Sequence, residues 1–212
     1  MRLTVFGASG RIGGLVVRQA LDAGHKVTAV VRATSGFESD HRGLEVVRVA
    51  ALTDPAAPAP ALDGADAVLS GLGPRGRKDT SVASSTTRVV LAAMRDAGVR
   101  RFVAVSAAPV VPPPPDDGLL NRKIIHPLVS TLLRGIYTDL RLMEEDIRRS
   151  GLEWTVVRPP RLTDGPLTGR YRTAVEANLA HGITISRADV AHAMLAVLDD
   201  PGLVNRAIGV AT

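Results

Sequence analysis

The sequence contains no cysteine and few aromatic residues. Among its 212 residues are three Phe, two Tyr and one Trp. The absence of cysteine excludes a disulfide scaffold, thiolate catalysis and a thiol-based zinc site. No apolar run approaches the length of a membrane-spanning helix, and no apolar signal segment precedes the first predicted strand. We therefore expect a cytoplasmic protein that does not bind a membrane.

Neither sign of charge dominates the sequence. Its 26 basic and 21 acidic residues leave a net charge of +5, spread along the chain. A basic stripe with stacking aromatic residues would be typical of nucleic-acid binding, and neither is present. The sequence also lacks a Gly-x-Ser-x-Gly elbow and any His/Asp/Glu cluster with metal-ligand spacing. We therefore expect neither a nucleic-acid partner, nor a hydrolase, nor a metal site.

Short apolar runs alternate with helical patterns along the chain. The patterns predict strands at 3–6, 26–31, 44–49, 67–70, 101–105 and 154–157, and helices at 81–97, 138–150 and 190–198. Ser186 and Asp189 form a capping box that opens the last helix. Such alternation is typical of a parallel sheet covered on both faces. The sequence therefore predicts a doubly wound, three-layer α/β/α fold, with residues 1–212 as a single domain.

A proline-rich stretch interrupts this alternation. Five prolines between residues 109 and 118 predict a loop. Beyond it, Leu120, Ile124, Leu128 and Leu132 share one helical face, which predicts an amphipathic helix packed mostly on the core. We expect the loop and helix, at about 109–136, to form the substrate side of the domain.

A glycine-rich turn follows the first predicted strand. It reads Gly7-Ala8-Ser9-Gly10-Arg11-Ile12-Gly13 and runs directly into a helical pattern. Glycine permits the tight turn and a close approach of backbone to phosphate, while the free amides of the helix N-terminus attract an anion. The spacing is G-x-x-G-x-x-G rather than G-x-G-x-x-G. The turn and its strand–helix context together predict a dinucleotide site.

The ends of the other predicted strands extend this site, because ligands of open parallel sheets lie at the carboxyl ends of the strands. Arg32 ends the second strand, where an NAD-binding protein usually has an acidic residue, so it favours the 2′-phosphate of NADP. Ser106 is the candidate catalytic hydroxyl. The further predicted cofactor contacts are Gly7, Ala8, Ser9, Gly10, Arg11, Ile12, Leu72, Gly73, Arg75, Ser106, Ala107 and Pro159.

Several motifs carry a family resemblance over essentially the whole chain. They are Phe6-Gly7-Ala8-Ser9-Gly10, Gly73-Pro74-Arg75, Arg158-Pro159-Pro160, Gly165-Pro166-Leu167-Thr168-Gly169 and Ile185-Ser186-Arg187-Ala188-Asp189. With them the sequence resembles the atypical branch of the short-chain dehydrogenase/reductase superfamily, NAD(P)H-binding proteins similar to flavin reductase (biliverdin-IXβ reductase) and to NmrA-like proteins. The resemblance implies an NAD(P)-binding Rossmann fold and NADPH as cofactor.

The sequence also departs from that superfamily. Its typical members use a Tyr-x-x-x-Lys pair as proton donor, whereas this chain has Tyr137 followed by Arg141. We interpret Tyr137 as a packing residue. Reductase relatives commonly have Thr-Ser where this chain has Ser106-Ala107, so polarisation of a substrate rests on Ser106.

These features predict an NADPH-dependent oxidoreductase that resembles flavin reductase and transfers hydride to a small planar acceptor, such as a flavin or quinone. Hydride transfer to such a ring requires mainly positioning, which tolerates the missing Tyr-Lys pair. The alternative is an NmrA-like redox sensor that binds NADP(H) without catalysis. A sugar-nucleotide epimerase is disfavoured because the chain has no room for the usual substrate domain. We expect a monomer or a homodimer.

Overall fold

The computed structural model describes residues 1–74, 76, 80–118, 128 and 131–212. The strands are β1 (Arg2–Phe6), β2 (Lys26–Arg32), β3 (Leu44–Val49), β4 (Ala67–Ser70), β5 (Arg101–Val105), β6 (Glu153–Arg158), β7 (Arg161–Thr163), β8 (Arg172–Val175), β9 (Thr184–Ser186) and β10 (Arg206–Ala211). The α-helices are α1 (Arg11–Asp22), α2 (Val82–Asp96), α4 (Arg134–Arg148) and α5 (Arg187–Ala196).

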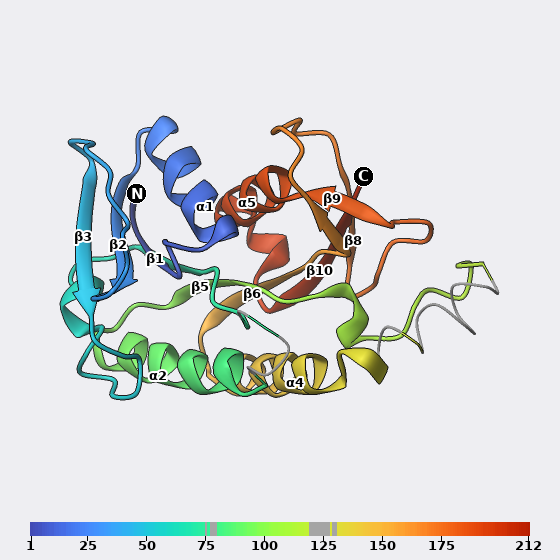
Figure 1. Ribbon diagram of the computed structural model, residues 1–212, viewed down its shortest axis with the longest axis horizontal. Coiled ribbons are helices and arrows are strands. Elements are labelled where there is room, and N and C mark those ends of the chain that lie inside the picture. The colour runs from blue at the N-terminus through green and yellow to red at the C-terminus, as the bar shows by residue number, and fades with distance from the viewer. Residues whose placement is uncertain (75, 77–79, 119–127, 129–130) are drawn as a thin grey trace.

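The described residues build an eight-stranded sheet in the order β3-β2-β1-β4-β5-β6-β10-β8. Every pairing in it is parallel except that of β10 with the edge strand β8. Helices α1 and α5 cover one face and α2 and α4 cover the other (Figure 1). The predicted doubly wound parallel sheet is confirmed. The order in which successive strands are added to the sheet reverses between β1 and β4, which is where such folds bind ligands.

The central strands are apolar because both of their faces are covered. All four residues of β4 and all five of β5 are buried, as expected of strands inside a parallel sheet. Helix α1 buries Val16, Val17, Ala20 and Leu21, spaced so that one stripe faces the sheet. The hydrophobic core therefore lies in two layers, one on each face of the sheet.

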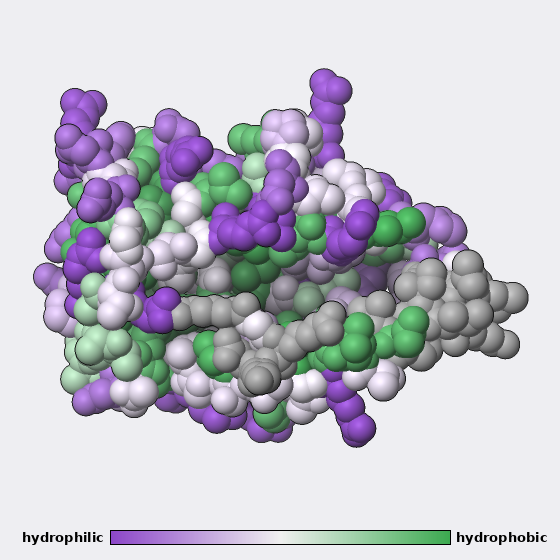
Figure 2. Space-filling view, in the orientation of Figure 1, coloured by the Kyte–Doolittle hydropathy of each residue, from purple (hydrophilic) through white to green (hydrophobic). Residues whose placement is uncertain are grey.

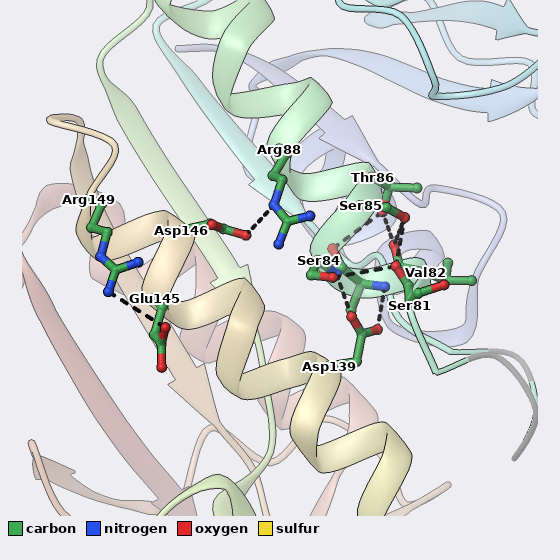
Figure 3. A network of polar contacts seen from close by, with 11 residues as sticks. Ser81, Val82, Ser84, Ser85, Thr86, Arg88, Asp139, Glu145, Asp146 and Arg149 are labelled. Atoms are coloured by element: carbon green, nitrogen blue, oxygen red, sulfur yellow. Dashed lines mark hydrogen bonds and ion pairs between the residues drawn. The ribbon is translucent and has the colours of Figure 1, made fainter.

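A side chain of α4 caps α2 (Figure 3). The Asp139 carboxylate accepts hydrogen bonds from the backbone amides of Ala83 (2.8 Å) and Ser84 (3.1 Å). Ser81, at the N-cap position itself, makes no side-chain cap. Arg88 of α2 also pairs with Asp146 of α4 at 2.7 Å. These contacts tie the two helices of one layer together.

Three helix predictions need correction. Helix α4 begins at Arg134 rather than 138, because Leu133 and Ile136 at its start are partly buried against the hydrophobic core and extend the packed part of the helix. Helix α5 spans Arg187–Ala196, with Ser186 as its cap as predicted. The side chains of Leu128 and Leu132 are exposed instead of packed on the core, while Leu120 and Ile124 lie outside the described residues.

Strands β7 to β10 were not predicted. They are short or carry little alternation, and β10 is recognised as a strand only through its pairing with β6 and β8. The short β7 and β9 pair with each other in a separate two-stranded sheet. In the part of the chain that the structure describes, no helix has the length and apolar character needed to cross a membrane.

Candidate functional site

The glycine-rich turn between β1 and α1 is closely packed. Gly7 adopts φ +72°, and a Cβ there would lie 2.9 Å from the carbonyl carbon of Gly71. A Cβ on Gly13 would lie 2.2 Å from the Gly7 carbonyl oxygen. Real Cβ atoms do not approach backbone so closely, so both positions require glycine. The turn therefore lies directly against the chain that leaves β4.

Beside this turn a cleft of about 540 Å³, the central cleft, crosses the carboxyl ends of β1, β2, β4 and β5. It is lined by Gly7, Ser9, Gly10, Arg11, Ile12, Arg32, Gly71, Leu72, Gly73, Pro74, Val105, Ser106, Leu140, Leu162 and Arg187. The first turn of α1 holds no acidic residue and its N-cap, Gly10, supplies no side-chain cap. The N-terminal amides of α1 therefore remain available to an anion.

Three arginines line the central cleft. Arg11 and Arg187 both pair with the Asp164 carboxylate, Arg187 at 2.7 Å. Arg32 is exposed at the end of β2 and takes part in no ion pair or side-chain hydrogen bond among the described residues. Its guanidinium is therefore free to bind a phosphate at the strand end where the sequence predicts the 2′-phosphate.

Ser106 lies at the end of β5, on the wall of the central cleft. Its backbone amide donates to the Val157 carbonyl at 2.8 Å, which fixes its position. The residue is 8% exposed, and its buried Oγ has no hydrogen-bond partner among the described residues. A buried hydroxyl without a partner is costly unless something else bonds to it. This hydroxyl is suited to bond a ligand held in the cleft.

A second, mainly apolar pocket of about 440 Å³, the side pocket, lies beside the central cleft. It is lined by Ala107, Ala108, Pro109, Pro113, Pro114, Asp117, Leu133, Tyr137, Pro160, Arg161, Asn178, Leu179, Gly182 and Ile183. Adjacent residues of two segments line the two spaces. Ser106 and Leu162 line the cleft, and their neighbours Ala107 and Arg161 line the pocket. Figure 2 shows hydrophobic residues at the bottom of a hollow in the middle of this face, with hydrophilic residues along its upper edge.

Hydrogen bonds hold the proline-rich wall of the side pocket in place. Arg141 Nε donates to the Val110 carbonyl at 2.9 Å. The Asn178 amide nitrogen donates to the Ala108 carbonyl at 2.9 Å, and the His181 backbone amide donates to Asp117 at 3.1 Å. Because Arg141 is engaged with loop carbonyls, it does not substitute for the lysine of a Tyr-x-x-x-Lys pair.

Helix α4 is fixed to the sheet by a buried ion pair. Glu144 and Arg158, 1% and 2% exposed, are joined by two hydrogen bonds of 3.0 and 2.5 Å. The same helix contributes Leu140 to the central cleft and Tyr137 to the side pocket. Burial raises the pKa of the Tyr137 phenol, which keeps it neutral. Tyr137 is packed as predicted, with its edge on the pocket.

Another buried carboxylate, Asp189, organises the loop beyond β7. It accepts hydrogen bonds from the amides of Thr168 and Gly169 and from the hydroxyls of Thr168 and Ser186, at 2.8–3.0 Å. Burial by itself raises the pKa of Asp189, but these hydrogen bonds together hold it below its ordinary value. The charged carboxylate therefore anchors this loop to the start of α5.

The structure brings most of the predicted cofactor residues together. Those that line the central cleft are Gly7, Ser9, Gly10, Arg11, Ile12, Arg32, Leu72, Gly73 and Ser106. Ala8 is buried in the core and Ala107 lines the side pocket. Pro159 is buried, and its carbonyl accepts a hydrogen bond from the Ala108 amide. Arg75 lies outside the described residues.

Leu140 and Arg187 line the central cleft although neither was predicted as a site residue, and Leu162, expected with Arg161 in the substrate wall, lines the cleft instead. Arg187 stands in a stretch noted for its helix cap and its family resemblance, with no role at the cofactor predicted for it, and its place in the cleft depends on how α5 packs beside α1. Within the described ranges, no group of three or more His, Asp or Glu side chains is placed to hold a metal ion.

Comparison with known proteins agrees with this geometry. A family model described as NAD(P)H-binding matches residues 7–201. The Arabidopsis thaliana uncharacterized chloroplastic protein At2g34460 is 32% identical over 208 residues, covering 93% of this chain and 71% of that protein. The uncharacterized sugar epimerase YhfK of Bacillus subtilis is 30% identical, covering 98% of this chain and 92% of its own.

Among solved structures, a Streptococcus pneumoniae protein assigned as an NADH–flavin reductase superposes with a TM-score of 0.77 and 26% identity, over 100% of this chain and 99% of that one. The match to the family model spans the glycine-rich turn, every cleft residue and α5. The chain therefore belongs to the NAD(P)H-binding family of Rossmann-fold, oxidoreductase-like proteins.

Proposed function

We propose that this protein is an NADPH-dependent oxidoreductase that reduces a small planar acceptor such as a flavin or quinone. The observation that carries the proposal is the adjacency of the two spaces. Ser106 and Ala107 of one segment, and Leu162 and Arg161 of another, line the central cleft and the side pocket respectively. A cofactor in the cleft would therefore lie next to an apolar space able to take a flat ring.

The residues of the central cleft suit a phosphorylated dinucleotide. Gly7 and Gly13 keep side chains away from the turn, and the free amides of α1 would bind the pyrophosphate. Arg32, which has no ion pair among the described residues, would bind the 2′-phosphate, and Ser9 and Arg11 line the same cleft. This charge arrangement supports NADPH over NADH.

When bound, NADPH supplies a hydride from its nicotinamide ring. The protein's part is to hold the acceptor and exclude water, which the apolar wall from Pro109 to Pro114 and Ile183 would do. The Ser106 hydroxyl, which has no partner among the described residues, would donate a hydrogen bond to the acceptor atom that gains electron density. No other protein acid is needed, because water can supply the proton to a reduced flavin or quinone.

A non-catalytic redox sensor is the second candidate. It is favoured by Arg141, which holds the loop carbonyls instead of supporting Tyr137 as a proton donor. The name of the YhfK relative adds a sugar epimerase as a third activity to assay.

One assay separates these functions. NADPH oxidation is followed by absorbance with FMN, FAD or a short quinone as acceptor, together with calorimetric titration of NADPH and NADH. Turnover that depends on an acceptor supports the reductase, and Ser106→Ala should then lower kcat about tenfold with the NADPH Kd changed by less than about twofold. Tight NADPH binding without turnover would instead identify a sensor, and interconversion of nucleotide sugars without net oxidation would identify an epimerase.

A further inference from the structure

We propose that Arg161 makes the side pocket select acceptors that carry an anionic group, so that FMN is preferred to riboflavin. This inference rests on the proposed function and names the acceptor class of the same site. FMN and riboflavin share one ring system and differ by a phosphate, so they isolate the feature that Arg161 would recognise.

Arg161 is directed to the acceptor side of the site by the strand that carries it. It opens β7 directly after Pro160, and its amide donates to the Ile183 carbonyl at 3.3 Å. Successive residues of a strand point to opposite sides. Accordingly, Leu162 lines the central cleft while Arg161 lines the side pocket. Arg161 is thus separate from the arginines that face the cofactor.

The guanidinium of Arg161 has no ion-pair partner among the described residues. Among the described residues that line the side pocket it is the one cation, and no described carboxylate lies within 4.0 Å of it. The pocket's own carboxylate, Asp117, accepts a hydrogen bond from the His181 amide instead. The other residues that line the side pocket with Arg161 are mostly proline, leucine, isoleucine and alanine. A forked cation beside apolar walls favours a ligand with a flat apolar body and a phosphate at one end.

The shape of the pocket fits the same class of ligand. Its volume of about 440 Å³ lies within the range usual for small-molecule sites. Its proline-rich wall is already held by the hydrogen bonds of Asn178 and Arg141. Because the wall is preformed, little conformational entropy is lost in the loop when an acceptor binds. The charge of the acceptor then decides which of two acceptors with the same ring system binds more tightly.

The test is equilibrium binding of FMN and of riboflavin, followed by quenching of flavin fluorescence, with and without saturating NADP⁺. We expect FMN to bind about tenfold more tightly than riboflavin, the scale of one charge-assisted contact at a partly exposed site. In Arg161→Gln the FMN Kd should rise to that of riboflavin, whose own Kd changes by less than about twofold. Arg42→Gln, an exposed arginine at the opposite edge of the sheet, is the matched control.

Equal affinity for the two flavins in the unaltered protein, equal loss of both in Arg161→Gln, or no binding of either flavin would overturn the inference. Failure of the proposed function is a different result. Selective FMN binding that depends on Arg161, without any NADPH oxidation, would refute the reductase and leave the anion-selective pocket in place.

Discussion

Arg32→Glu tests the assignment of the cofactor most directly. Arg32 is exposed, lines the central cleft and has no ion pair among the described residues, so the replacement breaks no contact that stabilises the fold. We expect the free energy of unfolding to change by less than about 0.5 kcal/mol. Any change in cofactor affinity then reports on binding alone.

The magnitude follows from the contact that is lost. A hydrogen-bonded charge pair with a phosphate contributes about 1.5–3 kcal/mol, and solvent exposure at the strand end weakens it while charge reversal adds repulsion. We expect NADPH binding to weaken by about 1–3 kcal/mol, roughly 5- to 150-fold in Kd. NADH lacks the 2′-phosphate, so its Kd should change little.

The assay is calorimetric titration of both cofactors at two salt concentrations, since added salt should reduce the NADPH preference that Arg32 creates. Arg42→Glu is the control, because it alters the net charge equally but lies before β3, at the amino end of the strands. Equal weakening of NADPH and NADH by Arg32→Glu, or equal weakening of NADPH by the control, would refute Arg32 as the phosphate-binding residue.

Three further predictions concern the frame of the site. Gly13→Ala should destabilise the fold by more than about 2 kcal/mol and abolish cofactor binding, because its Cβ would lie 2.2 Å from a carbonyl oxygen, whereas Gly36→Ala meets nothing within 4 Å. Glu144→Gln should lower the free energy of unfolding by about 3–5 kcal/mol, because it leaves the buried Arg158 without its carboxylate. Glu153→Gln, in an exposed ion pair, should lower it by at most about 1 kcal/mol. Asp189→Asn should lower the free energy of unfolding by about 1–3 kcal/mol near neutral pH.

The Asp189 prediction has a definite pH dependence. Although burial opposes it, hydrogen bonding lowers the pKa of Asp189 in the folded protein below its ordinary value of 3.8. Its contribution to stability is therefore present above pH 3.8 and is lost as the pH falls through the folded-state pKa. Denaturant unfolding at a series of pH values measures this. An acid-side decline that is as steep in Asp189→Asn as in the unaltered protein would contradict it.

The same unfolding measurements test the other two substitutions. If Gly13→Ala and Gly36→Ala were equally stable, the close packing of the turn would be refuted. If Glu144→Gln cost no more than Glu153→Gln, the buried pair would not be what fixes α4 to β6.

The sequence alone determined the elements of this protein that form from residues close together along the chain. The apolar runs of β1 to β6, the glycine-rich turn and Arg32 at the end of β2 are visible in sequence order, because strand formation, turn geometry and helix capping act over a few residues. From these followed the doubly wound sheet, which the structure confirms, and the prediction of a dinucleotide site at its carboxyl edge, where the structure has the central cleft.

Tertiary structure alone decided which distant side chains complete the site. Asp139 caps a helix that begins more than fifty positions earlier, and Asp164 pairs with both Arg11 and Arg187, two residues that line the cleft. Strand β10 joins the sheet between β6 and β8 with no strong pattern of its own. Such contacts arise because packing the helices on the sheet brings together residues that no local pattern relates, and their energies depend on that burial and proximity.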